Sequence, residues 1–181
     1  GLADDDLDFV LLDPAPVDAA VPGAAGADAS APLGDPASRA AAMLQAKLTG
    51  AQSAGHVLEV VSNQFDDMDP LHMVTALHRL ARFRSRGEAA VFARDPLRLA
   101  LLRKLGGVLD ELSELSLCCV LWALARLSTA PDWLDKLMDR GAEAAPALSA
   151  HQLTTALYAL ARLHRLPAAQ RSQKLIEALH H

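Results

Sequence analysis

Residues 117–127 read Leu-Cys-Cys-Val-Leu-Trp-Ala-Leu-Ala-Arg-Leu, and the same pattern occurs twice more in the chain. Residues 73–83 and 153–163 align with it without gaps, at successive intervals of 44 and 36 residues. Within each block the apolar side chains fall at i, i+3, i+4, i+7 and i+8, which forms one continuous stripe on an α-helix. Amphipathic helices repeated at this period are typical of stacked helical hairpins. The blocks therefore predict the second helices of three helical pairs.

A residue that can cap a helix lies four positions before each block. These residues are Asp69, which Pro70 follows, Ser113 and Ser149, and Gln152 completes a capping box with Ser149. Proline and glycine positions between the blocks mark the first helix of each pair. We expect these first helices at roughly 54–66, 95–110 and 131–145, with another beginning at 167–180.

Together these elements predict an all-α protein, a right-handed α-solenoid of about three helix-pair repeats with an extended N-terminal arm and no strand in residues 35–181. Aromatic residues make up only 4% of the chain and apolar residues 51%, a balance that favours closely packed helices. The expected divisions are an acidic Pro/Ala-rich arm at 1–34, a capping helix at 35–50 opened by Asp35-Pro36, and a repeat domain at 51–181 with units at 54–84, 95–129, 131–166 and 167–181 (partial).

The N-terminal arm has the composition of a linker, with many prolines, alanines and aspartates and little apolar bulk. A short apolar run flanked by acids is the exception. It can act as a peptide that docks in a partner's groove, or it can belong to a disordered tail. The run contains Leu7, Phe9, Val10, Leu11 and Leu12.

Charge is distributed unevenly along the chain. Residues 1–50 hold eight acidic and two basic residues, whereas residues 51–181 hold fourteen acidic and fifteen basic residues. The near-neutral body lacks the dense positive field that gives a nucleic-acid binder its non-specific affinity, although a groove can still be locally basic. The least charged stretch, Ala144 to Ala161, is interrupted by Pro146 and several polar residues, so we expect no membrane span.

Three runs resemble the octotricopeptide-type repeat of algal organellar proteins: Pro131-Asp-Trp-Leu134, Leu121-Trp-Ala-Leu-Ala125 and Leu157-Tyr-Ala-Leu-Ala-Arg-Leu163. The resemblance covers roughly residues 55–181 and is weakest in the first unit, where Arg79 replaces an alanine of the core. It departs from the family at Leu-Cys-Cys and Leu-Thr-Thr, where the family has Leu-Ala-Asn. The resemblance implies an organellar location, in the mitochondrial matrix or the plastid stroma, and a part in transcript or ribosome biology.

One position of the blocks carries an aromatic ring in every copy, His78, Trp122 and Tyr158. These rings can stack on nucleic-acid bases, or they can wedge between the helices of their own repeat. The adjacent Cys118 and Cys119 have neither disulfide nor metal-ligand spacing, so we expect them to pack in the core. A reducing compartment fits this usage.

Basic residues also recur at fixed places. Arg82, Arg126 and Arg162 end the second helices, where they can line a phosphate track or answer the helix dipole. Lys104 and Arg140 lie thirteen residues before their blocks, and they can contact phosphates or lie on a solvated face. All are candidates for RNA contact, with Arg103 and Lys136 as neighbours.

The chain contains no phosphate-binding glycine loop, nucleophile elbow or metal-ligand spacing. We therefore predict a non-enzyme with no catalytic residue, no metal and no cofactor. Two functions remain. The first is a scaffold in an organellar RNA–protein assembly, such as a mitochondrial ribosome or a transcript-processing complex. The alternative is a protein-binding structural subunit of a large organellar complex (respiratory, ATP synthase or photosynthetic) that makes no RNA contact.

Overall fold

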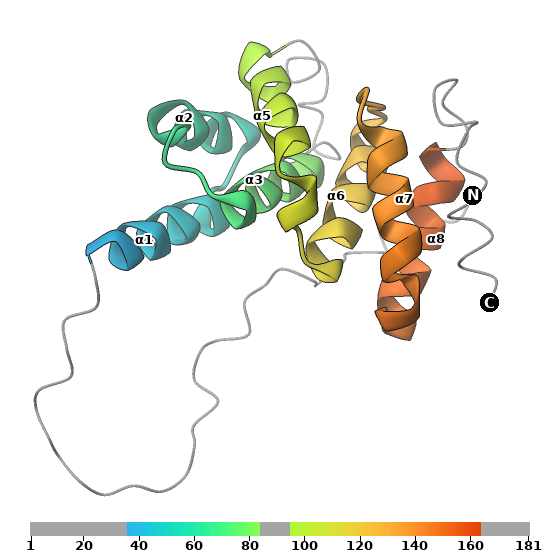
Figure 1. Ribbon diagram of the computed structural model, residues 1–181. Helices are drawn as coiled ribbons and strands as arrows, with labels where there is room; N and C mark the ends of the chain where they lie inside the picture. The colour runs from blue at the N-terminus through green and yellow to red at the C-terminus, as the bar shows by residue number, and fades with distance from the viewer. Residues whose placement is uncertain (1–35, 84–94, 164–181) are drawn as a thin grey trace, which may run out of the picture.

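The computed structural model describes residues 36–83 and 95–163, and these residues fold as helices without any strand (Figure 1). The prediction of an all-α protein is confirmed for this part of the chain. Its α-helices are α1 (Pro36–Gly50), α2 (Ala54–Gln64), α3 (Pro70–Phe83), α5 (Pro96–Gly107), α6 (Glu114–Leu127), α7 (Leu134–Ala144) and α8 (Ala150–Leu163), with 3-10 turns at Leu109–Glu111 and Ala145–Ala147.

Side chains cap the second helices as the sequence indicates. The Asp69 carboxylate accepts a hydrogen bond from the His72 backbone amide (2.9 Å), and Ser113 Oγ accepts one from the Ser116 amide (3.2 Å). The capping box is also present, because the Ser149 amide donates to Gln152 Oε1 at 2.7 Å while the Gln152 amide donates to Ser149 Oγ at 3.3 Å. These bonds satisfy amides that have no partner within their helix.

Four helices, α1, α3, α6 and α8, pack against one another in succession, and we call them the row helices. Figure 1 shows α1 at one end of the molecule and α8 at the other. Gln45 Nε2 donates to Thr75 Oγ1 at 3.0 Å, and His72 Nε2 lies 2.9 Å from the Ala41 carbonyl oxygen. Residue numbers thus increase together along α1 and α3, so these two helices run parallel.

The helix α1 has more than a capping role, because it follows the same packing pattern as the repeated blocks. Its buried residues Leu44 and Leu48 precede Ala76 and Leu80 of α3 by 32 residues in each case. On this alignment Gln45 matches Leu77, which also precedes α6's Leu121 by the repeat interval of 44. The structure therefore packs α1 beside α3, as the first of the row helices.

Each row helix has two opposite faces. The leading face is defined by Thr75, which faces α1, and alignment of the repeats assigns to the same face Met43 and Lys47 in α1, Arg79 in α3, Cys119 and Ala123 in α6, and Thr155 and Ala159 in α8. The trailing face is defined by Gln45, which faces α3, and the same alignment assigns to it Leu77 and Ala81 in α3, Leu121 and Ala125 in α6, and Leu157 and Ala161 in α8. The bond between Gln45 and Thr75 joins a trailing face to a leading face directly.

The helices α2, α5 and α7 flank this row. The Trp133 ring, just before α7, packs against α5. Trp133 Nε1 donates to the Leu102 carbonyl oxygen at 3.0 Å, and its ring lies over Gly106. A Cβ at position 106 would lie 2.4 Å from Trp133 Cδ1, which no packed side chain tolerates. Gly106 therefore makes room for the tryptophan, and α5 continues through it to Gly107.

Leu157 corrects one expectation from the sequence. The repeat predicts that Leu121 and Leu157 are equivalent members of a buried stripe, but Leu121 is 1% exposed and Leu157 is 44% exposed. The difference arises because α8 packs on the trailing face of α6, whereas no described helix packs on the trailing face of α8.

We expect Leu121→Ala to lower the free energy of unfolding by about 2–5 kcal/mol, because the change leaves a cavity between packed row helices. Leu157→Ala removes the same atoms from a half-exposed site, so the loss should be below about 1 kcal/mol. Urea unfolding followed by circular dichroism measures both values. Equal losses would mean that Leu157 is buried in solution.

We expect Gly106→Ala to destabilise the protein by about 1–3 kcal/mol, because the new methyl group forces Trp133 from its site. Gly107→Ala is the matched control, since a Cβ there meets nothing within 4 Å. The control should be neutral or slightly stabilising, because alanine favours helix more than glycine does. A Gly106 variant as stable as the control would contradict the packing of Trp133.

Candidate functional site

Basic residues of the flanking helices α5 and α7 bind carbonyl and carboxylate groups of the same chain. The Lys104 ammonium group donates to the carbonyl oxygens of Phe65 and Asp66, just after the end of α2, and lies 4.9 Å from the centre of the Phe65 ring. A cation in this place stabilises the negative end of the α2 dipole and satisfies carbonyl groups that have no helical partner. Lys104 therefore joins α5 to α2. A phosphate bound to Lys104, one of the two roles that the sequence allows, would compete with these carbonyl groups.

A similar link occurs one repeat later. Lys136 Nζ donates to the Asp110 carboxylate at 2.7 Å, and Arg140 Nη1 lies 3.3 Å from the Glu143 carboxylate. Arg140 Nε also lies 4.0 Å from Asp110. The hydrogen bond from Lys136 and the charges of Lys136 and Arg140 lower the pKa of the exposed Asp110 carboxyl group. As with Lys104, cations of one flanking helix reach the end of the preceding one.

These contacts give the recurrent cations partners within the same chain. Lys104, Lys136 and Arg140 have internal partners, which a bound phosphate would have to displace. Arg103 is exposed on the same helix as Lys104. The sequence places Lys104 and Arg140 at matching positions, but their contacts differ: Lys104 donates to carbonyl oxygens after α2, whereas Arg140 lies 3.3 Å from Glu143 of its own helix and 4.0 Å from Asp110.

The arginines at the ends of the row helices are half-buried and lie beside aromatic rings of their own helix. The Arg126 guanidinium lies 5.5 Å from the centre of the Trp122 ring. Arg162 lies 5.7 Å from that of Tyr158, and its Nη1 donates to the Tyr158 hydroxyl at 2.9 Å. Arg82, in the equivalent place of α3, acts on His78 through its charge. Each guanidinium lies one turn after the aromatic ring of its own helix, where cation–π attraction favours it.

The aromatic position of the three blocks, occupied by His78, Trp122 and Tyr158, is mostly buried. His78 and Trp122 are 2% and 4% exposed, and their ring centres lie 4.8 Å apart across the α3–α6 contact. Neither ring can stack on a base in this state, and the two rings contact each other across neighbouring row helices. Tyr158 is half-buried, so it is the most exposed of the three rings.

The other buried groups of interest are the two cysteine thiols and the Arg98 guanidinium. Burial raises the pKa of the Cys118 thiol to about 11 and that of Cys119 to about 12, so neither forms a thiolate at neutral pH. The packing role expected for the cysteines is supported by their burial. Arg98, which no sequence pattern singled out, is 6% exposed and donates to Thr129 Oγ1, which ties the start of α5 to the turn after α6.

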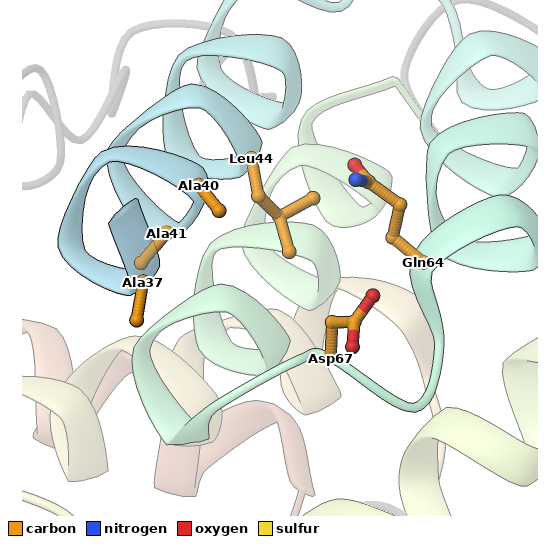
Figure 2. Close-up of a pocket in the computed structure, with 6 residues that line it drawn as sticks. All are labelled: Ala37, Ala40, Ala41, Leu44, Gln64 and Asp67. Carbon is orange, nitrogen blue, oxygen red and sulfur yellow. The ribbon is translucent and has the colours of Figure 1, made fainter. Parts of the chain in front are cut away.

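One cavity of about 330 Å³ lies between α1 and the turn that joins α2 to α3 (Figure 2). Its volume is at the lower end of the range for ligand sites. Figure 2 shows the alanine methyl groups and Leu44 on one side, with the Gln64 and Asp67 side chains opposite. Gln64 Oε1 is itself buried. The polar group that the cavity presents to a ligand is therefore the exposed Asp67 carboxylate. This lining holds no pair of groups suited to acid–base or nucleophilic chemistry.

Within 36–83 and 95–163, no group of three or more His, Cys, Asp or Glu side chains is arranged to hold a metal ion. No helix in these ranges is both long and apolar enough to cross a membrane. The arm residues Leu7, Phe9, Val10, Leu11 and Leu12, the cap residue Asp35 and the partial unit at 167–181 lie outside the described residues. Comparison with models of protein families, with curated proteins and with solved structures found no match.

Burial lowers the pKa of His78 from 6.5 to about 4, and the positive charges of Arg82 and Arg79 add to the effect. The unfolded chain therefore binds a proton between these values that the folded protein excludes. Folding stability should be full above pH 6.5 and should fall by up to about 3 kcal/mol as the pH decreases to 4.

The measurement is urea unfolding of the protein and of His78→Leu from pH 7.5 to pH 4. The difference between the two proteins isolates the contribution of this ring from that of the other titrating groups. A parallel decline in both would mean that His78 is protonated in the folded state.

Proposed function

We propose that this chain is a non-catalytic helical-repeat scaffold, an α-solenoid of about three helix pairs, that holds protein partners in a large organellar assembly. The observation that carries the proposal is that two of the basic side chains suited to RNA contact, Lys104 and Lys136, are joined to the preceding unit, while an apolar face at the end of the row is exposed. Lys104 donates to carbonyl oxygens after α2, and Lys136 to Asp110. Leu157 is 44% exposed on the trailing face of α8.

Charge supports the same choice. The repeat region holds fourteen acidic and fifteen basic residues, so its long-range field attracts a polyanion only weakly. An exposed leucine on a helix face that is covered in the other units suits a partner with an apolar surface of its own. The location in the mitochondrial matrix or plastid stroma rests on the resemblance to octotricopeptide-type repeats.

A scaffold in an organellar RNA–protein assembly remains the second candidate, and one observation favours it. Arg162 and Tyr158 form a half-buried pair near the end of α8, with a guanidinium and a phenol ring side by side. Such a pair can contact a phosphate and stack on a base at the same time. The family resemblance points in the same direction.

The two candidates differ in the response to ribonuclease and salt. The tagged full-length chain is isolated from organelles with and without ribonuclease, and the retained proteins are identified. We expect the same proteins in both samples, and only weak binding of a fluorescent single-stranded RNA that disappears near physiological salt.

The charge-reversed pair Lys104→Glu and Arg140→Glu supplies the second arm of this test, after circular dichroism has established that the variant is folded. We expect no change in the set of retained proteins. Loss of the partners after ribonuclease, together with a flatter salt dependence of RNA binding in the variant, would favour the RNA candidate instead.

A further inference from the structure

We infer that copies of this chain stack end to end, with the leading face of α1 in one copy docked on the trailing face of α8 in the next. The inference is independent of the proposed scaffold function, because it concerns contacts between identical chains and does not require another partner. It rests on two exposed side chains, Met43 and Leu157, and on the contacts that the equivalent positions make inside the molecule.

Both exposed side chains occupy repeat positions that are buried elsewhere in the row, the position of Met43 in α3, α6 and α8 and that of Leu157 in α3 and α6. Met43 is 57% exposed, whereas Thr75, Cys119 and Thr155 at the equivalent leading positions are at most 5% exposed. Leu157 is 44% exposed, whereas Leu77 and Leu121 at the equivalent trailing position are at most 1% exposed. Their exposure thus follows from their place in the outermost row helices.

The internal contacts determine which residues would meet at a junction between copies. Within one molecule, trailing Gln45 of α1 bonds to leading Thr75 of α3. The repeat positions of these two residues are occupied at the ends of the row by Leu157 and Met43, respectively. A junction that repeats the α1–α3 geometry would therefore bring Leu157 of one copy against Met43 of the next.

A second internal contact supplies a polar partner for the same junction. Arg79, on the leading face of α3, donates to the carbonyl oxygen of Ala51, just beyond the end of α1. The equivalent residues at the ends of the row are Lys47, which is exposed, and Leu163, the last residue of α8. The Lys47 ammonium group of one copy can thus approach the Leu163 carbonyl of the next.

Small residues allow the close approach that such a junction needs. Ala161 is exposed on the trailing face of α8, while the equivalent Ala81 and Ala125 are buried against the next row helix. A contact between two different faces is heterologous, so it does not close on itself unless the copies form a ring. The expected product is a concentration-dependent series of dimers and longer stacks.

The test uses analytical ultracentrifugation of the full chain over a wide concentration range. The wild-type protein should associate reversibly. Leu157→Glu and Met43→Glu should each weaken self-association at least about tenfold, because each places an unpaired charge in the centre of the contact. Leu99→Glu is the matched control, since Leu99 is 45% exposed on α5 away from both faces, and it should associate like the wild type.

Mixing the two blocked variants tests the polarity of the contact. Met43→Glu keeps an intact trailing face and Leu157→Glu an intact leading face, so a mixture should form one-to-one dimers and nothing longer. A wild-type protein that stays monomeric would overturn the inference and would favour coverage of α8 by residues 164–181 or by another protein. Blocked variants that remain monomeric when mixed, or a Leu99→Glu variant that also fails to associate, would overturn it as well.

Discussion

The structure depends on the contact of α6 with the row helices on both of its sides. Residues 117–125 of α6 are all buried, and α6 packs against both α3 and α8. The small side chains of Ala81 and Ala125 on the trailing faces of α3 and α6 allow neighbouring helices to approach closely. Because dispersion and apolar burial increase with the number of close contacts, the internal row helices α3 and α6 are stabilised on both sides and the outermost ones on one.

Charged groups serve this packing by joining successive units. Lys104 bonds to the carbonyl groups after α2, Lys136 to Asp110, and Arg79 to the carbonyl group of Ala51. Each cation reaches a group about 26 to 39 residues earlier in the chain. Such contacts fix the position of one unit relative to the last, which extended apolar stripes alone do not specify, because stripes can slide along one another. The recurrence of a cation in a repeat protein is therefore as consistent with assembly of the stack as with ligand binding.

The ends of the row differ from its middle in what they leave at the surface. Met43 and Leu157 belong to the faces that bury threonine, cysteine and leucine side chains elsewhere in the molecule. A repeat protein must cover or tolerate these faces, because the same side chains that hold neighbouring units together are attractive to any complementary helix. The half-buried pair of Arg162 and Tyr158 lies on the same terminal helix, so protein contact and RNA contact would compete for one region of α8.

The sequence by itself determined the local features of this protein. Helix periodicity and the caps at Asp69, Ser113 and Ser149 depend on residues within a few turns of each other, where backbone geometry is decisive. The tertiary structure alone decided what lies beside each face. It placed α1 in the row, put Trp133 over Gly106, buried Arg98 and left Leu157 exposed. Such outcomes follow from contacts between segments about 30 residues apart, which no local pattern encodes, so equivalent residues in a repeat can be core in one unit and surface in the next.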